Sequence, residues 1–398
     1  MSTYLNSLGL ISPLGIGHAD TMAALLAGQH GLTPAPSTLI DRPTFIGAVS
    51  AQLPKLPPQW AQFHSRNNQL LYAASQQIDA EIRAAISRFG AARVAIILGS
   101  STSGVAESEA AIAALARGES APAGYSYLRQ EMADPARFLA ELYQIQGPAY
   151  VISTACSSSG RAFIAARRLL NMNLVDVVIC GGVDSLCQLT LNGFAALESI
   201  SAAQCRPFHA KRDGINIGEA AALMLMSRER GPVQLLGCGA SSDAHHISAP
   251  HPAGHGAVAA MRAALNDAAL PAKQIDYLNL HGTATPLNDA MESVAVRDVF
   301  AGYLPPSSST KSLTGHTLGA AAAIEAAFCW LLLQPSLNPL QQLPAPLNDN
   351  DFDGEFDPAL PPLNWVQAGQ SYALHTAMSN SFAFGGNNVS LILQRVPI

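Results

Sequence analysis

The sequence predicts a five-layer α-β-α-β-α architecture built from two duplicated α/β halves. Hydrophobic strands alternate with helical stretches along the 398 residues, which is typical of mainly parallel sheets covered by helices. A hydrophobic strand that ends in a small, hydroxyl-rich turn occurs at residues 93–102 and again, in similar form, at residues 275–285. Each half then closes on a Gly followed by a strand, at residues 218–226 and 386–393. These repeats indicate an old internal duplication.

The boundary between the halves falls near Gly231 and Pro232, which break regular structure. We therefore expect an N-terminal half over residues 1–231 and a C-terminal half over residues 232–398. Residues 335–362 are rich in Pro and carry several acidic side chains, which predicts a long surface excursion late in the second half.

Composition favours a compact α/β enzyme over a disordered chain or a repeat array. Charged residues make up only 13% of the chain and hydrophobic residues 49%, so most elements must bury much of their surface. The net charge of -6 comes without the basic stripe that a nucleic-acid-binding protein needs. We expect no nucleic-acid partner.

The sequence also argues against membrane insertion, export and disulfides. The longest apolar stretch, residues 320–333, is interrupted by Glu325 and is too short to span a bilayer. No Lys or Arg precedes Arg42, so the start lacks the charged region of a signal peptide. The six cysteines form no Cys-x-x-Cys pair, and we expect a cytoplasmic protein without disulfides or zinc.

Cys156 lies at a predicted switch from strand to helix. Residues 150–152 are β-prone, whereas residues 162–170 carry apolar side chains at helical spacing. A thiol at this junction faces the positive end of a helix dipole, which favours the nucleophilic thiolate. Most cysteines are small core residues, and it is this context that makes Cys156 a candidate nucleophile.

Three further segments carry chemistry, although each alone has a plainer interpretation. His281 ends a predicted strand and opens the motif His-Gly-Thr-Ala-Thr, but a lone His there is more often structural. His316 follows Lys311 at a strand-to-helix turn, where a helix N-terminus keeps an imidazole neutral; a lone Lys would be a solvated surface residue. The motif Phe-Gly-Gly-Asn-Asn, from Phe384, allows a tight turn whose N–H groups can face an oxyanion.

In this order the segments resemble the β-ketoacyl-acyl-carrier-protein synthases of the elongating type, members of the thiolase-like superfamily. The resemblance runs from residues 4–15 to the last strand and includes Cys-Arg-Pro-Phe at 205–208 and Ser-Ser-Asp-Ala-His-His at 241–246. It implies the thiolase-like form of the five-layer fold and an acyltransferase. The implied reaction is decarboxylative Claisen condensation of a Cys-bound acyl chain with malonyl-acyl carrier protein, which gives 3-oxoacyl-acyl carrier protein and carbon dioxide. It belongs to fatty acid elongation or to the related type II polyketide and aryl polyene pathways.

The resemblance implies a role for each matching residue. Cys156 attacks and holds the acyl group, and the backbone N–H groups of Cys156 and Phe384 form the oxyanion hole. His281 and His316, as neutral imidazoles, bind the malonyl thioester carbonyl and stabilise the enolate formed as carbon dioxide leaves.

Further matching residues support the site or bind substrate. Lys311 matches the family's active-site lysine and Glu325 its acidic partner, while Thr283 and Thr285 match hydroxyls that bind the pantetheine arm. The resemblance implies no metal and no resident cofactor, because phosphopantetheine arrives on the carrier protein.

The sequence departs from the family at the acyl pocket. Ala383 replaces a Gly in the loop that gates the pocket in relatives, which also contains Phe384 and Gly385. Thr102 falls where relatives set the far end of the pocket, often with a branched apolar residue. We therefore expect a substrate other than a plain saturated chain, such as a conjugated polyene or an aryl-capped chain.

The resemblance also implies partners. These are an acyl carrier protein and either a second copy or a homologous synthase subunit, giving a homodimer or a heterodimer. Arg66 falls where relatives place basic contacts for the carrier.

One alternative function is a non-catalytic subunit like a chain-length factor, but such a subunit lacks the nucleophile that Cys156 supplies here. The histidines at 245, 246, 251 and 255 lie in a Pro- and Gly-rich loop without helical presentation, which disfavours a metal site.

Overall fold

Two half-sheets with the same strand order form the centre of the protein. The computed structural model describes residues 2–346 and 355–397, so part of the predicted excursion at 335–362 lies outside the described residues. The order in the N-terminal half is β1 (Tyr4–Ser12), β9 (Ala220–Ser227), β7 (Val177–Asp184), β5 (Val94–Gly99) and β6 (Ala149–Ile152). The order in the C-terminal half is β10 (Val233–Ser242), β15 (Asn387–Arg395), β14 (Thr376–Phe382), β11 (Tyr277–Asn279) and β12 (Pro306–Ser308), with β13 (Asn364–Trp365) at the edge.

The pairing pattern repeats as well as the order. β5 pairs in parallel with β6 and β7, and β11 pairs in parallel with β12 and β14. The next two pairings inward are antiparallel in both halves. β1 and β10 join the halves at Tyr4↔Gln234 and Leu5↔Val233, giving one 12-stranded sheet. The predicted duplication is confirmed by this topology, while the division into two domains at 231/232 stays a prediction.

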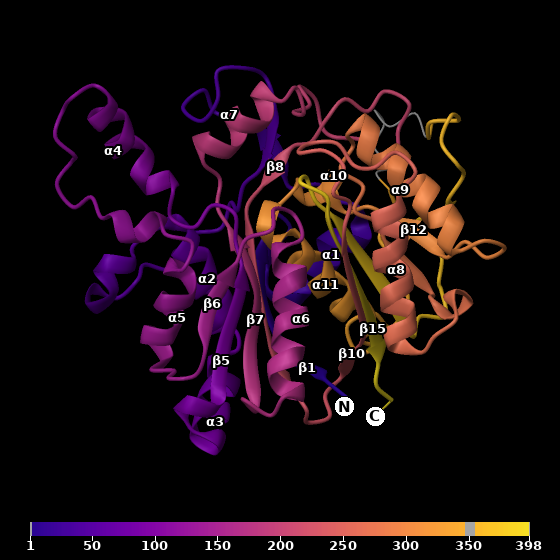
Figure 1. Ribbon diagram of the computed structural model, residues 1–398, viewed down its shortest axis with the longest axis horizontal. Coiled ribbons are helices and arrows are strands. Elements are labelled where there is room, and N and C mark those ends of the chain that lie inside the picture. The colour runs from indigo at the N-terminus through magenta and orange to yellow at the C-terminus, as the bar shows by residue number, and fades with distance from the viewer. Residues whose placement is uncertain (1, 347–354, 398) are drawn as a thin grey trace.

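Helices form the remaining three layers, which Figure 1 shows from left to right. On the outer face of the N-terminal half lie α2 (Arg66–Gln76), α3 (Asp79–Phe89) and α5 (Asp134–Tyr143). Between the half-sheets lie α6 (Ser158–Asn171) and α11 (Ala321–Leu332), and α8 (His255–Ala268) and α9 (Pro286–Val299) cover the C-terminal half. The predicted five-layer fold is confirmed.

Helix α11 explains the long apolar stretch in the sequence. Every residue of α11 is buried, because a helix between two half-sheets has no face toward water. Small alanines dominate its N-terminal part and let both half-sheets approach closely. Among the described residues, no helix is long and apolar enough to cross a membrane.

The remaining elements lie around this core. A three-stranded sheet contains β3 (Leu32–Pro34), β4 (Phe45–Gly47) and β8 (Ile217–Gly218), and β2 (Gly15–Ile16) pairs with β1. The other helices are α1 (Gly17–Ala27), α4 (Ala106–Ala116), α7 (Gln188–Ala196) and α10 (Lys311–Thr314). The 3-10 turns are η1 (Pro58–Phe63), η2 (Ala91–Arg93), η3 (Tyr127–Gln130), η4 (Ala272–Gln274) and η5 (Leu318–Ala320).

Candidate active site

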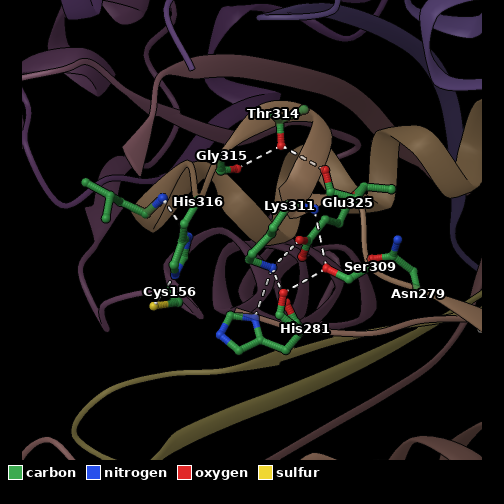
Figure 2. A network of polar contacts seen from close by, with 12 residues as sticks. Cys156, Asn279, His281, Ser309, Lys311, Thr314, Gly315, His316 and Glu325 are labelled. Atoms are coloured by element: carbon green, nitrogen blue, oxygen red, sulfur yellow. Dashed lines mark hydrogen bonds and ion pairs between the residues drawn. The ribbon is translucent and has the colours of Figure 1, made fainter. Parts of the chain in front are cut away.

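Cys156 lies in the turn between β6 and α6, close to where the sequence predicts the strand-to-helix switch. The preceding Ala155 has φ +52°, a left-handed conformation that is strained for a residue with a Cβ. The Cys156 side chain is buried, and its Sγ lies 2.9 Å from Nε2 of His316 (Figure 2). The nucleophile of one half therefore meets an imidazole of the other.

The hydrogen bonds of His316 define its tautomer. The backbone N–H of Leu318 donates to Nδ1 at 3.1 Å, so Nδ1 is an acceptor. In the neutral ring the proton is therefore on Nε2, the atom that faces Cys156. His316 presents a hydrogen-bond donor to the reaction centre.

His281 has the same tautomer for a different reason. The Lys311 Nζ lies 3.3 Å from Nδ1 of His281 and 2.5 Å from its backbone oxygen (Figure 2). An ammonium group only donates, so Nδ1 accepts and Nε2 carries the proton. The rings of His281 and His316 lie 5.4 Å apart, nearly perpendicular. Both Nε2–H donors therefore belong to one small space beside the thiol.

Both imidazoles are neutral at physiological pH. Burial, and after it the Lys311 charge, lowers the pKa of His316 well below its usual range. For His281, burial, Lys311 and then His316 lower the pKa in the same direction. The sequence argument invoked a helix N-terminus at His316, but burial is the main cause.

Lys311 is held by an ion pair that is fully buried. Its Nζ contacts Oε1 of Glu325, which projects from α11 (Figure 2). Burial raises the pKa of Glu325 to about 7, and the Lys311 charge opposes this shift. The pair places a cation behind both imidazoles without exposing it to water.

The groups around Cys156 only partly offset the effect of burial on the pKa of its thiol. Burial raises the pKa of the Cys156 thiol to about 11, whereas Lys311 and the backbone N–H groups of Phe384 and Cys156 lower it. Two other buried cysteines, Cys205 and Cys238, have a pKa of about 12. The expected thiolate stabilisation therefore acts in the predicted direction but is smaller than the desolvation cost. The two N–H groups that face the sulfur are the predicted oxyanion donors.

Phe384 lies in the hairpin turn between β14 and β15. The N–H of Ala383 donates to the oxygen of Asn387 at 2.8 Å, and Gly386 donates back to Ala383 at 2.9 Å. Gly385 and Gly386 have φ +84° and +75°, which requires glycine, but Ala383 is outside that region. Ala383 therefore fits this turn without backbone strain, although its effect on gating stays a prediction.

Thr283 and Thr285 lie beside a surface cleft. Their hydroxyl oxygens are 3.0 Å apart, and Thr285 lines a cleft of about 270 Å³ together with Phe384 and Leu287. The cleft thus connects the surface with the hairpin above Cys156. Its position suits an extended arm, and the pantetheine role of both hydroxyls stays a prediction.

The Thr102 hydroxyl is hydrogen-bonded within the protein, whereas the sequence led us to expect it at the far end of the acyl pocket. Its Oγ1 donates to Oδ1 of Asp184 at 2.7 Å and accepts from the N–H of Ser185 at 3.2 Å. Only its methyl group remains to meet an acyl chain, so the hydroxyl adds no polarity to a pocket.

Two buried carboxylates near the site have no counterpart in the sequence interpretation. Glu292 of α9 accepts the N–H groups of His281 and Gly282, both at 2.8 Å, and burial raises the pKa of Glu292 to about 7. Asp184 ends β7 and accepts hydrogen bonds from both halves. Asp184 is the polar end of an otherwise apolar buried strand, a signal that could have drawn attention to it, whereas Glu292 shares its helix with other buried polar residues and gives no such signal.

The remaining candidates are Arg66, which is engaged within the protein, and the loop histidines, of which His245, His251 and His255 lie ring against ring. The Arg66 guanidinium contacts buried Glu219 and donates to the oxygen of Val49, so its charge is partly neutralised within the protein. Among the described residues one group could hold a metal, namely Cys156, His281 and His316, with ligand atoms within 4.8 Å. The loop histidines form no such group there, and the expectation of no metal or cofactor stays a prediction.

Two family matches cover most of the chain. Residues 6–231 match the family described as "Beta-ketoacyl synthase, N-terminal domain", and residues 233–342 match "Beta-ketoacyl synthase, C-terminal domain". The 3-oxoacyl-[acyl-carrier-protein] synthase 2 of Coxiella burnetii is 30% identical over 98% of each chain. The mitochondrial 3-oxoacyl-[acyl-carrier-protein] synthase of Arabidopsis thaliana is 36% identical over 64% of this chain but only 58% of its own length.

Solved structures agree with these matches. A chain of the complex between the ketosynthase ApeO and its chain length factor ApeC, from Xenorhabdus doucetiae, is 44% identical with a TM-score of 0.93, covering 99% of this chain and 98% of its own. A chain of the ishigamide ketosynthase/chain length factor is 27% identical with a TM-score of 0.86, covering 100% and 99%.

Proposed function

The chain belongs to the β-ketoacyl synthase family of condensing enzymes, and we propose that it elongates a carrier-bound acyl chain by decarboxylative condensation with malonyl-acyl carrier protein. One observation carries the proposal: the thiol of Cys156 and two neutral imidazoles, each with its proton on Nε2, share one buried space. That set provides a nucleophile and the donors that an enolate requires.

The first half-reaction is acyl transfer to Cys156. The sulfur attacks the thioester carbonyl of acyl-carrier protein, and the N–H groups of Cys156 and Phe384 stabilise the oxyanion. The carbon–sulfur bond to pantetheine breaks, and the departing sulfur receives the proton that the thiol gives up. The new thioester holds the chain while the carrier protein exchanges.

The second half-reaction uses both imidazoles. Nε2–H of His281 and of His316 donate to the carbonyl oxygen of the malonyl thioester, so the bond to the carboxylate breaks and carbon dioxide leaves an enolate. The enolate carbon attacks the acyl group on Cys156. Cys156 departs as thiolate, takes a proton from solvent, and releases 3-oxoacyl-carrier protein two carbons longer.

The partners are an acyl carrier protein and a second synthase subunit. The names of the curated relatives specify acyl carrier protein, and two of the similar structures contain a chain length factor. We expect this chain to be the catalytic subunit of such a heterodimer, since the nucleophile, both histidines and Lys311 are present. A homodimer is the simpler assembly and would appear as a single species on mass analysis of the active enzyme.

The substrate is a conjugated polyene or aryl-capped chain in an aryl polyene-type pathway. Support comes from the similarity to a chain of the ApeO–ApeC complex, at 44% identity over 99% of this chain.

Mass spectrometry of products tests the function. The enzyme, with and without a chain-length-factor partner, is given malonyl-carrier protein and either a saturated or a polyenoyl acyl-carrier protein. The proposal requires a product two carbons longer, formed faster from the polyenoyl chain. Faster elongation of the saturated chain would overturn the substrate assignment, and failure to acylate Cys156 would favour the non-catalytic alternative.

A further inference from the structure

Asp184 is a fully buried carboxylate that the proposed mechanism does not use. Its Oδ1 accepts four hydrogen bonds of 2.7–2.8 Å, from the Ser100 hydroxyl, the Ser101 N–H, and both the N–H and the hydroxyl of Thr102. Burial raises the pKa of Asp184, and these donors oppose the shift. One oxygen is therefore fixed to the loop after β5, in the N-terminal half.

The other oxygen of Asp184 reaches the turn that carries His316. Oδ2 accepts the backbone N–H of Gly319 at 2.5 Å. A Cβ at position 319 would lie 2.8 Å from Oδ2 and 2.8 Å from the carbonyl carbon of Ser100, so only glycine lets the backbone approach this closely. The carboxylate thereby ties the two halves together directly behind the reaction centre.

Leu318, the residue before Gly319, explains why this contact matters. Leu318 has φ +52°, a conformation that costs about 1–2 kcal/mol for a residue with a Cβ. Its N–H is the group that donates to Nδ1 of His316 at 3.1 Å. Strain of this kind persists only where neighbouring contacts hold the backbone, and the bond from Gly319 to Asp184 is such a contact.

We propose that Asp184 is a positioning residue: by holding the strained turn through Gly319, it directs the Leu318 N–H to His316 and fixes the Nε2–H tautomer. This inference rests on the proposed function, in which that proton stabilises the enolate. Without the Leu318 contact, the neutral ring can carry its proton on Nδ1 and present an acceptor to the malonyl carbonyl. Decarboxylation would then fail although the thiol remains intact.

Asp184→Asn tests the proposal with almost no change in volume. The amide can accept at one position, but its NH₂ group would face the Gly319 N–H, so donor would oppose donor. We expect kcat for malonyl-carrier protein decarboxylation to fall about tenfold or more, the effect typical of losing a group that orients a functional histidine, with KM within about twofold of wild type. Asp134→Asn is the matched control, because Asp134 is equally buried and accepts a hydrogen bond from Asn68, but on the outer face of the N-terminal half.

Selective ¹⁵N-histidine labelling reports the tautomer directly. The His316 signals are assigned by their loss in His316→Ala. In wild type and in Asp134→Asn they must show a protonated Nε2 and an unprotonated Nδ1, whereas Asp184→Asn must shift both signals toward the other tautomer. Unchanged signals and an unchanged decarboxylation rate in folded Asp184→Asn would overturn the proposal.

The wild-type spectrum keeps the test independent of the variant's folding. If Asp184→Asn does not fold, a wild-type His316 protonated on Nδ1 would by itself refute the proposal. Failure of the proposed function is a separate result, since wild-type enzyme that neither loads acyl groups nor decarboxylates malonyl-carrier protein would still report its tautomer.

Discussion

Cys156 and His316 touch within the same site but serve different half-reactions, so their loss has different consequences. Cys156→Ala removes the atom that holds the chain, and condensation should fall below detection. His316→Ala leaves the thiol and the N–H groups of Cys156 and Phe384, so we expect acyl loading within about threefold of wild type but decarboxylation at least about 100-fold slower, as for loss of one oxyanion donor. Intact-mass analysis of loading and release of carbon dioxide measure the two steps. Condensation by His316→Ala at the wild-type rate would refute the enolate role.

The raised pKa of Cys156 predicts how alkylation depends on pH. Iodoacetamide reacts with the thiolate, and with a pKa of about 11 the thiolate fraction still increases at every pH below that value. The rate of Cys156 labelling should therefore rise about tenfold per pH unit from pH 7 to 9, without a plateau. Peptide mapping by mass spectrometry follows the labelled site, and Cys156→Ala controls for the other cysteines. A plateau between pH 6 and 8 would mean that the surrounding donors outweigh burial.

Helices α10 and α11 are joined by the buried ion pair between Lys311 and Glu325. Removing one partner leaves an uncompensated charge inside the central layer, which costs about 3–5 kcal/mol. We expect Lys311→Met and Glu325→Leu each to lower the free energy of unfolding by that order. The double variant should be less destabilised than either single variant, because it leaves no orphan charge.

Denaturant unfolding measures this coupling, and an exposed pair supplies the control. Arg83 and Asp79 form an ion pair on the surface of α3, and Asp79→Asn should change stability by less than about 0.5 kcal/mol. Additive losses in the Lys311 and Glu325 variants would contradict the coupling.

At the scale of the whole molecule, the sequence predicts what depends on local pattern and misses what depends on distant contacts. Cys156, His281 and His316 are recognisable because each belongs to a short local motif, and these motifs occur in the order found in the family. The role of Asp184 could not be predicted, because its partners Ser100 and Gly319 lie 84 and 135 residues away in the sequence. The main cause of neutral imidazoles was also missed, since burial arises only when the half-sheets close around α11.

The packing of the two halves against each other is a further property of the whole molecule. Gly160 of α6 faces both the other central helix and the other half-sheet: an added Cβ would lie 2.8 Å from Val389 Cγ1 and 3.3 Å from the Cβ of Ala322. Gly193 of α7 is also helical, but an added Cβ there meets no atom within 4 Å. The same substitution therefore has opposite expected effects at the two sites.

Gly193→Ala should raise the free energy of unfolding by about 0.5–1 kcal/mol, because alanine restricts the unfolded chain and favours helix. At Gly160 the same gain is opposed by overpacking, which costs about 1–3 kcal/mol, so Gly160→Ala should lower stability. Val389→Ala opens the space that the new methyl group needs, and the pair Gly160→Ala/Val389→Ala should be more stable than the sum of its single variants predicts. Thermal and denaturant midpoints measure all four proteins. A stabilising Gly160→Ala would mean that α6 has room to move between the half-sheets, and that the central layer is packed less tightly than its close contacts indicate.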